Sequence, residues 1–136
     1  MMHYFDIPGE ALPDGIARKP FSDAVLAGDT VYVSGRIGLD PQTGKPPQEL
    51  ADEARRLIES LRGALEAAKL SLRDLVQVTI YSSNVADFAE FNAVYLDYFR
   101  DAPLPARAFI GSGPLLFGAR FELTAIARTG TSRAAP

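Results

Sequence analysis

A long amphipathic segment between residues 50 and 68 constrains the fold of this chain more than any other feature. Its apolar residues recur at steps of three and four, which predicts a helix of about five turns with one buried stripe. The stripe consists of Leu50, Ala54, Leu57, Ile58, Leu61, Leu65 and Ala68. The opposite face is charged and includes Glu53. Such a helix must place its stripe against a sheet or another helix.

Segments with strand periodicity lie on both sides of this helix. Apolar and polar side chains alternate in them, as they do in strands with one buried face. A Gly28-Asp29 step between two short apolar runs is a hairpin signal. The predicted strands are two within residues 24–34 and one each at 75–82, 106–110 and 121–128.

A second helix is predicted after Asn84, a good N-cap residue, and Pro103 and Pro105 prevent its continuation. The resulting order is strand, strand, helix, strand, helix, strand, strand. This order predicts an α+β fold of one mixed sheet with both helices on a single face. We expect each pair of consecutive strands to be a hairpin and one crossover to connect parallel neighbours.

One domain accounts for the whole pattern, because 136 residues are too few for two domains of ordinary size. We assign residues 1–128 to this domain and expect residues 129–136 to form a disordered tail. The sheet face away from the helices carries polar and aromatic side chains. By alternation these are Tyr32, Ser34, Gln77, Thr79, Tyr81, Glu122, Thr124 and Ile126. Either an oligomer covers this face or it is an ordinary solvated sheet.

The amino-acid composition excludes several kinds of active site. The chain has no cysteine, and its one histidine, His3, lies near a terminus that we expect to fray. Disulfides, thiol nucleophiles, thiolate zinc sites and Ser/His/Asp triads therefore do not account for its function.

The charge distribution argues against two classes of partner. A formal net charge of -3 with scattered basic residues disfavours binding to nucleic acid. The sequence has no apolar run of about 18 residues and no signal segment, so we expect a cytoplasmic protein that does not enter a membrane.

Arg107 and Glu122 are the candidates for chemistry. Arg107 lies at the start of an otherwise apolar strand, where a guanidinium needs an anionic partner. That partner is either an internal carboxylate such as Glu122 or the carboxylate of a ligand. Glu122 is either a solubilising strand residue or a group that orients water and moves a proton. The Ser34-Gly35 pair could present backbone donors to a ligand, but no G-x-S-x-G motif accompanies it.

Five segments, taken in order, resemble the RidA family, also called YjgF. They are VYVSGRIGLDPQTG (31–44), LADEARRLIESLRGALEAA (50–68), DFAEFNAVYLDYF (87–99), PARAFI (105–110) and FELTAIA (121–127). The resemblance covers the chain from about Phe21 to Ala127. It implies a chorismate-mutase-like α+β fold that assembles as a homotrimer with ligand clefts between subunits. It also implies hydrolysis of reactive imines and enamines to 2-keto acids and ammonia, without a metal or a cofactor.

The same resemblance implies roles for individual residues. Arg107 would hold the substrate carboxylate, and Glu122 would lie near the reacting water. Ser34 and Gly35 would line the pocket. Asn92 corresponds to an asparagine in the N-x-x-Y stretch of the family.

Several residues depart from the family pattern, and LLFGA (115–119) stands where the family usually has a leucine-proline turn. Phe21 stands where deaminases of the family usually have a tyrosine. Phe109 replaces a small residue or a cysteine, and it would narrow the pocket if it points the same way as Arg107. Arg36 stands where glutamine is common. The departures indicate a divergent branch.

Three functions therefore remain. The leading hypothesis is an imine or enamine deaminase, whose substrate could be larger, such as an aminomuconate-like compound. The alternative is a non-catalytic trimer that binds small carboxylates. RNA binding or cleavage is the third, and the acidic balance of the chain disfavours it.

Overall fold

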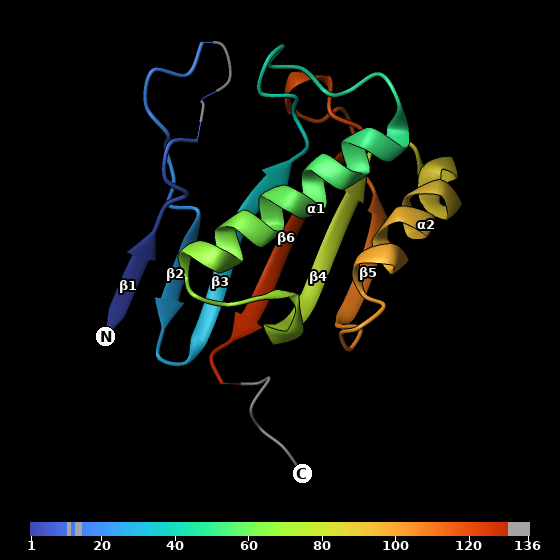
Figure 1. Ribbon diagram of the computed structural model, residues 1–136. Helices are drawn as coiled ribbons and strands as arrows, with labels where there is room; N and C mark the ends of the chain where they lie inside the picture. The colour runs from blue at the N-terminus through green and yellow to red at the C-terminus, as the bar shows by residue number, and fades with distance from the viewer. Residues whose placement is uncertain (11, 13–14, 131–136) are drawn as a thin grey trace.

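The structure is a computed structural model that describes residues 1–10, 12 and 15–130 (Figure 1). Its strands are β1 (Met2–Phe5), β2 (Ala24–Ala27), β3 (Thr30–Ile37), β4 (Leu75–Ser82), β5 (Ala106–Gly111) and β6 (Phe121–Arg128). Its α-helices are α1 (Leu50–Ala67) and α2 (Phe88–Tyr98). Short 3-10 helices are η1 (Leu72–Asp74), η2 (Val85–Asp87) and η3 (Leu116–Gly118).

The six strands form one mixed sheet in the order β1-β2-β3-β6-β4-β5. Strands β4 and β5 are parallel, and the other neighbours are antiparallel. Both α-helices cover the same face of the sheet (Figure 1). The predicted α+β class, the mixed sheet and the two helices on one face are therefore confirmed.

The predicted hairpin of the last two strands is wrong. Strand β6 lies between β3 and β4, whereas β5 lies at the edge on the other side of β4. The reason is burial: every second residue of β6 is buried, from Phe121 to Ala127, so this strand belongs in the centre of the sheet. The hairpin predicted around Gly28-Asp29 is confirmed as β2 and β3.

The N-terminus does not fray as expected. Residues Met2–Phe5 form β1, an antiparallel strand on the edge of the sheet beside β2. His3 is exposed on this strand and lies opposite Leu26. Backbone hydrogen bonding to β2 holds a segment whose side chains are too exposed to show a clear apolar pattern.

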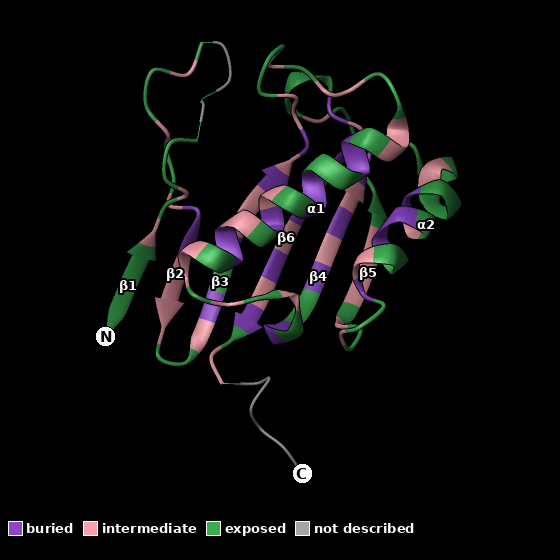
Figure 2. Ribbon diagram, viewed as in Figure 1, coloured by how far each residue is buried: buried purple, intermediate pink, exposed green. Residues whose placement is uncertain are grey.

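The core lies between the sheet and the two α-helices (Figure 2). The predicted stripe of α1 supplies Leu57, Ile58, Leu61 and Leu65, all of them fully buried. Helix α1 also approaches the chain after β3 closely, because a Cβ on Gly38 would lie 2.9 Å from the backbone nitrogen of Leu57. Only glycine allows this approach.

The C-terminal end of the described region is hydrogen-bonded to the turn between β2 and β3. The backbone N–H of Thr129 donates to the carbonyl of Asp29 at 2.9 Å, so the chain is still anchored one residue beyond β6. The rest of the predicted tail, residues 131–136, lies outside the described residues. Within the described part of the chain, no helix is both long and apolar enough to span a bilayer.

Candidate functional site

Glu122 lies against a bulge in strand β3. The pairing of β3 with β6 shifts register between Val33 and Arg36, so Ser34 and Gly35 fall outside the regular ladder. A Cβ on Gly35 would collide with the Glu122 carboxylate, which shows how closely the two residues approach. The structure thus brings together Ser34, Gly35 and Glu122, three of the residues predicted for the site.

The bulge is joined to the segment before β2. The Ser34 hydroxyl donates to the carbonyl of Ser22, and the Ser34 backbone N–H donates to the carbonyl of Asp23 at 3.0 Å. Phe21 precedes Ser22 and is 46% exposed. The Lys19 ammonium lies 5.9 Å from the centre of the Phe21 ring. Phe21 is therefore the neighbour in sequence of a residue that contacts the bulge, and its exposed ring has no hydroxyl.

Arg107 lies on the helix-covered side of the sheet, in strand β5. Its neighbour across the ladder is Val78, which is fully buried beneath the helices. The guanidinium carbon lies 4.8 Å from the ring centre of Tyr95, 5.7 Å from that of Phe88 and 5.9 Å from that of Phe109. We call these three rings the aromatic cage. Cation–π contacts of this kind hold a guanidinium by its flat faces and leave its N–H edge available for an anion.

Neither Arg107 nor Glu122 has an ion-pair partner among the described residues. The sequence left open an ion pair between Arg107 and Glu122. Alternation along β4, β5 and β6 explains why this pair does not form. Arg107 shares the face of Val78, whereas Glu122 shares the opposite face with Tyr81. The sheet itself separates the two charges within one chain.

Phe109 points to the same side as Arg107, as alternation predicted. Its ring packs edge-on against Phe88, with 5.0 Å between ring centres, and lies 5.7 Å from Phe91 and 6.5 Å from Phe121. The ring is therefore part of the wall behind the guanidinium, continuous with the apolar core.

Asn92 lies on the face of α2 that carries the cage residues Phe88 and Tyr95, because the three positions follow helical spacing. The Asn92 Oδ1 atom and the Tyr95 hydroxyl are both buried, and neither has a hydrogen-bond partner within the described structure. Burial raises the pKa of Tyr95 to about 12, against the opposing effect of the Arg107 charge. The Tyr95 hydroxyl therefore stays protonated at neutral pH.

Two supporting groups escaped the sequence analysis. Glu53, predicted on the charged face of its helix, is fully buried. Its carboxylate accepts from the Arg120 guanidinium and from the Arg120 backbone N–H, both at 2.7 Å, and from the Phe121 N–H at 3.4 Å. Its spacing of three from Leu50 and four from Leu57 was a signal that it could face inward. It anchors the start of β6 directly before Glu122.

The second group is a set of ions around Asp23 and Arg36, both of which are buried. In the sequence, Arg36 stands out only as an unusual residue after Gly35, and Asp23 does not stand out. Nothing in the spacing of these residues shows that they meet. In the described part of the chain, no three His, Cys, Asp or Glu residues are placed to hold a metal ion.

Comparison with known proteins identifies the family. Residues 13–129 match the family described as Endoribonuclease L-PSP, which spans most of the chain. The chain belongs to this family. The resemblance to RidA and YjgF found in the sequence is thereby confirmed.

Members of the L-PSP family with known names or structures resemble most of the chain. The rat protein named 2-iminobutanoate/2-iminopropanoate deaminase is 39% identical over 111 residues, which cover 81% of this chain and 80% of that protein. The crystal structure of the E. coli YjgF gene product has a TM-score of 0.79 and 32% identity, and covers 91% of this chain and 98% of that one. The structure of E. coli TdcF with bound serine has a TM-score of 0.77 and 33% identity, with 82% and 90% covered.

Proposed function

We propose that this protein hydrolyses 2-imino acids and their enamine tautomers to 2-keto acids and ammonia. One observation carries the proposal: Arg107 is held by three aromatic rings and has no carboxylate partner among the described residues. A guanidinium in this setting suits a ligand carboxylate, which it can bind through two parallel hydrogen bonds. The names of several relatives, which describe deaminases of 2-iminobutanoate and 2-iminopropanoate, support the same substrate class.

The chemistry needs only a held substrate and a placed water. Glu122 accepts a hydrogen bond from the water, the water oxygen forms a bond to the imine carbon, and the C=N π electrons move to nitrogen. Glu122 takes the water proton and passes it to the nitrogen. The carbinolamine hydroxyl then gives its proton to the amino nitrogen through Glu122. As the C–N bond breaks, the hydroxyl oxygen forms the C=O bond, which releases ammonia and leaves the 2-keto acid. An imine carbon is already electrophilic, so positioning supplies much of the rate.

The proposed site requires two copies of the chain. Arg107 and Glu122 point to opposite faces of the sheet, so a ligand as small as 2-iminopropanoate cannot touch both within one chain. We propose a homotrimer in which Arg107 of one copy and Glu122, Ser34 and Gly35 of the next copy meet in one cleft. The polar and aromatic face over β3, β4 and β6 supports an assembly, because Tyr32 there is 51% exposed. Asn92, Phe109 and Phe21 complete the proposed lining.

The test is deamination of 2-iminopropanoate made in place from 2-aminoacrylate. We expect the purified protein to accelerate ammonia release over the spontaneous rate and Arg107→Ala to remove at least 99% of that acceleration. The Arg107→Ala variant must keep the assembly state of the wild type. If the wild type gives no acceleration, the proposed function is wrong for this substrate.

Phe21 favours a second candidate, a trimer that binds small carboxylates without turning them over. Its exposed ring supplies no hydroxyl to orient water or substrate. The structure of TdcF with bound serine supports binding of a small carboxylate in the family. Saturable binding of pyruvate that depends on Arg107, without any deamination, would favour this candidate. Turnover of a larger imine, such as an aminomuconate, would instead indicate a deaminase with another substrate.

A further inference from the structure

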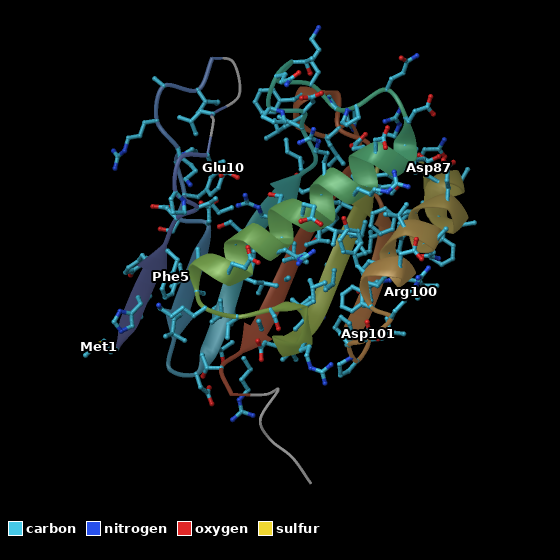
Figure 3. The ribbon with its side chains drawn as sticks, viewed as in Figure 1. Met1, Phe5, Glu10, Asp87, Arg100 and Asp101 are labelled. Atoms are coloured by element: carbon cyan, nitrogen blue, oxygen red, sulfur yellow. The ribbon has the colours of Figure 1, made fainter. Side chains whose placement is uncertain are left out.

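Arg36 is a buried cation directly after the bulge, and its side chain is only 5% exposed. Its guanidinium donates in three directions. Nε donates to the hydroxyl of Ser60 in α1 at 2.9 Å, and Nη2 donates to the Glu10 carboxylate at 2.9 Å. Nη1 donates to the Asp23 carboxylate, directly before β2. Glu10 lies in the N-terminal segment beyond β1 (Figure 3). One side chain thus joins α1, the N-terminal segment and the start of β2.

Asp23 connects the Arg36 guanidinium to the bulge at Ser34 and Gly35. Its carboxylate, which is fully buried, also accepts from the Ile7 N–H at 2.8 Å and from the Lys19 ammonium. Its own backbone carbonyl accepts the Ser34 N–H at 3.0 Å. The carbonyl of the preceding residue, Ser22, accepts the Ser34 hydroxyl. The ion pair of Arg36 and Asp23 therefore restrains the backbone of Ser22 and Asp23, and the two carbonyls of that backbone accept from Ser34.

The Asp23 carboxyl stays ionised at neutral pH. Burial by itself would raise the pKa of the Asp23 carboxyl, but hydrogen bonds from Lys19, the Ile7 N–H and Arg36 lower it below its ordinary value of 3.8. Lys19 also lies 3.2 Å from Asp6 and 3.8 Å from Glu10. The Asp23 carboxylate is therefore available to Arg36 and Lys19 at neutral pH.

Arg36 does not touch the site that it supports. Its guanidinium lies on the helix side of the sheet, where it contacts Ser60, whereas Glu122 lies on the opposite face against Gly35. Any effect on Glu122 must pass through the backbone of the bulge. The effect should therefore fall on the placement of the bulge and not on the charge of Glu122.

We propose that Arg36 is a positioning residue for the reaction: through Asp23 it holds the Ser34-Gly35 bulge against Glu122 and so sets the backbone that faces the substrate. The proposal rests on the proposed function only for its kinetic consequence. The structural consequence, an ordered bulge, can be measured without substrate.

The experiment compares Arg36→Gln with Arg128→Gln. Arg128 lies at the C-terminal end of β6 and pairs with the exposed Asp29 at 2.8 Å, so Arg128→Gln controls for the loss of an arginine charge and ion pair at the surface. Amide hydrogen exchange is measured at Ser34 and Ile7, with Leu123 as a core reference. In Arg36→Gln we expect exchange at Ser34 and Ile7 to rise about tenfold or more while Leu123 changes less. In Arg128→Gln all three amides should exchange as in the wild type.

Kinetics supply the second measurement. We expect Arg36→Gln to lower kcat for 2-iminopropanoate about tenfold and to change KM less than about threefold, since Arg107 still holds the carboxylate. Arg36→Lys, which keeps the charge against Asp23, should recover part of kcat. Equal exchange at Ser34 in wild type and Arg36→Gln would overturn the proposal, and so would an unchanged kcat in an active enzyme.

If Arg36→Gln does not fold, the exchange at Ser34 can be measured in a milder variant. Ser60→Ala removes only the acceptor of the Arg36 Nε–H, and we expect a smaller rise in Ser34 exchange in the same direction. Exchange that rises equally at Ser34 and Leu123 would show a purely structural role and contradict the proposal. If the wild type has no deaminase activity, the proposed function fails, while the exchange measurements still decide whether Arg36 orders the bulge.

Discussion

The Arg107 side and the Glu122 side of the molecule hold their charges in opposite ways. Arg107 rests on the aromatic cage, and no carboxylate among the described residues neutralises it. Glu122 lies against the backbone of the bulge in β3. Buried ions hold the backbone on both strands: Glu53 at the start of β6, and the pair of Asp23 and Arg36 next to the bulge. Buried ion pairs on the helix side of the sheet support Glu122 through the backbone, whereas Arg107 has no carboxylate partner in the described structure. Substitutions should therefore act differently on the two sides.

The largest effect is expected at Glu53. Glu53→Ala removes the carboxylate partner of the Arg120 guanidinium, which then donates only to the carbonyls of Pro47 and Gln48, and it leaves two backbone N–H groups without their acceptor. This should cost about 3–5 kcal/mol in the free energy of unfolding. Asp52→Ala is the control, because it breaks only the exposed pair with Arg55 and should cost about 0.5 kcal/mol or less. Urea unfolding of both variants measures the difference. Similar values for both would show that Glu53 does not support β6.

We expect substitutions of Glu122 and Arg107 to differ in their effect on KM. Glu122→Gln keeps the size of the side chain but cannot take the water proton, so kcat should fall about 100-fold or more with little change in KM. Arg107→Gln should raise KM as well, because it removes the contact to the substrate carboxylate. Initial rates of 2-keto acid formation measure both constants. A normal kcat in Glu122→Gln would remove this residue from the mechanism.

The bulge itself can be tested with one methyl group. Gly35→Ala places a Cβ into the Glu122 carboxylate, the flexible end of that side chain, so Glu122 must move. We expect a small loss of stability, about 1 kcal/mol or less, together with a lower kcat. Gly113→Ala is the matched control, because its Cβ would meet no atom within 4 Å. Thermal unfolding and initial rates compare the two. If Gly35→Ala behaved like Gly113→Ala, the contact between Gly35 and Glu122 would not restrict the site.

The smallest effect is expected on the aromatic side. Tyr95→Phe keeps the ring beside Arg107 and removes a buried hydroxyl that has no partner in the described structure, so stability should stay equal or rise by up to about 1 kcal/mol. The pKa of about 12 adds a dependence on pH. Between pH 10 and 12 the unfolded chain loses the Tyr95 proton before the folded chain does, so stability falls as the pH rises. Tyr95→Phe should reduce this alkaline loss. An unchanged loss would assign it to other groups, such as Tyr98, whose pKa is also raised to about 12.

Local patterns predicted most of the secondary structure. The stripe of α1, the alternation in β4 and β6 and the Gly28-Asp29 turn each depend on residues a few positions apart, so the sequence contains the full signal. The same alternation predicted that Phe109 and Arg107 share a face, and the ladder confirms it. The placement of β6 between β3 and β4 could not be read in this way, because strand order depends on which strands bury most surface across the whole sheet.

The sequence by itself determined the fold class, the family and the lack of cysteine that excludes thiol chemistry. Only the tertiary structure decided which charges meet. Asp23 and Arg36 are 13 positions apart, and Glu53 and Arg120 are 67 positions apart, yet each pair is in direct contact. The structure also placed Arg107 and Glu122, only 15 positions apart, on opposite faces of one sheet. Helical and strand periodicity act over a few residues, whereas ion pairs form wherever packing brings buried charges together.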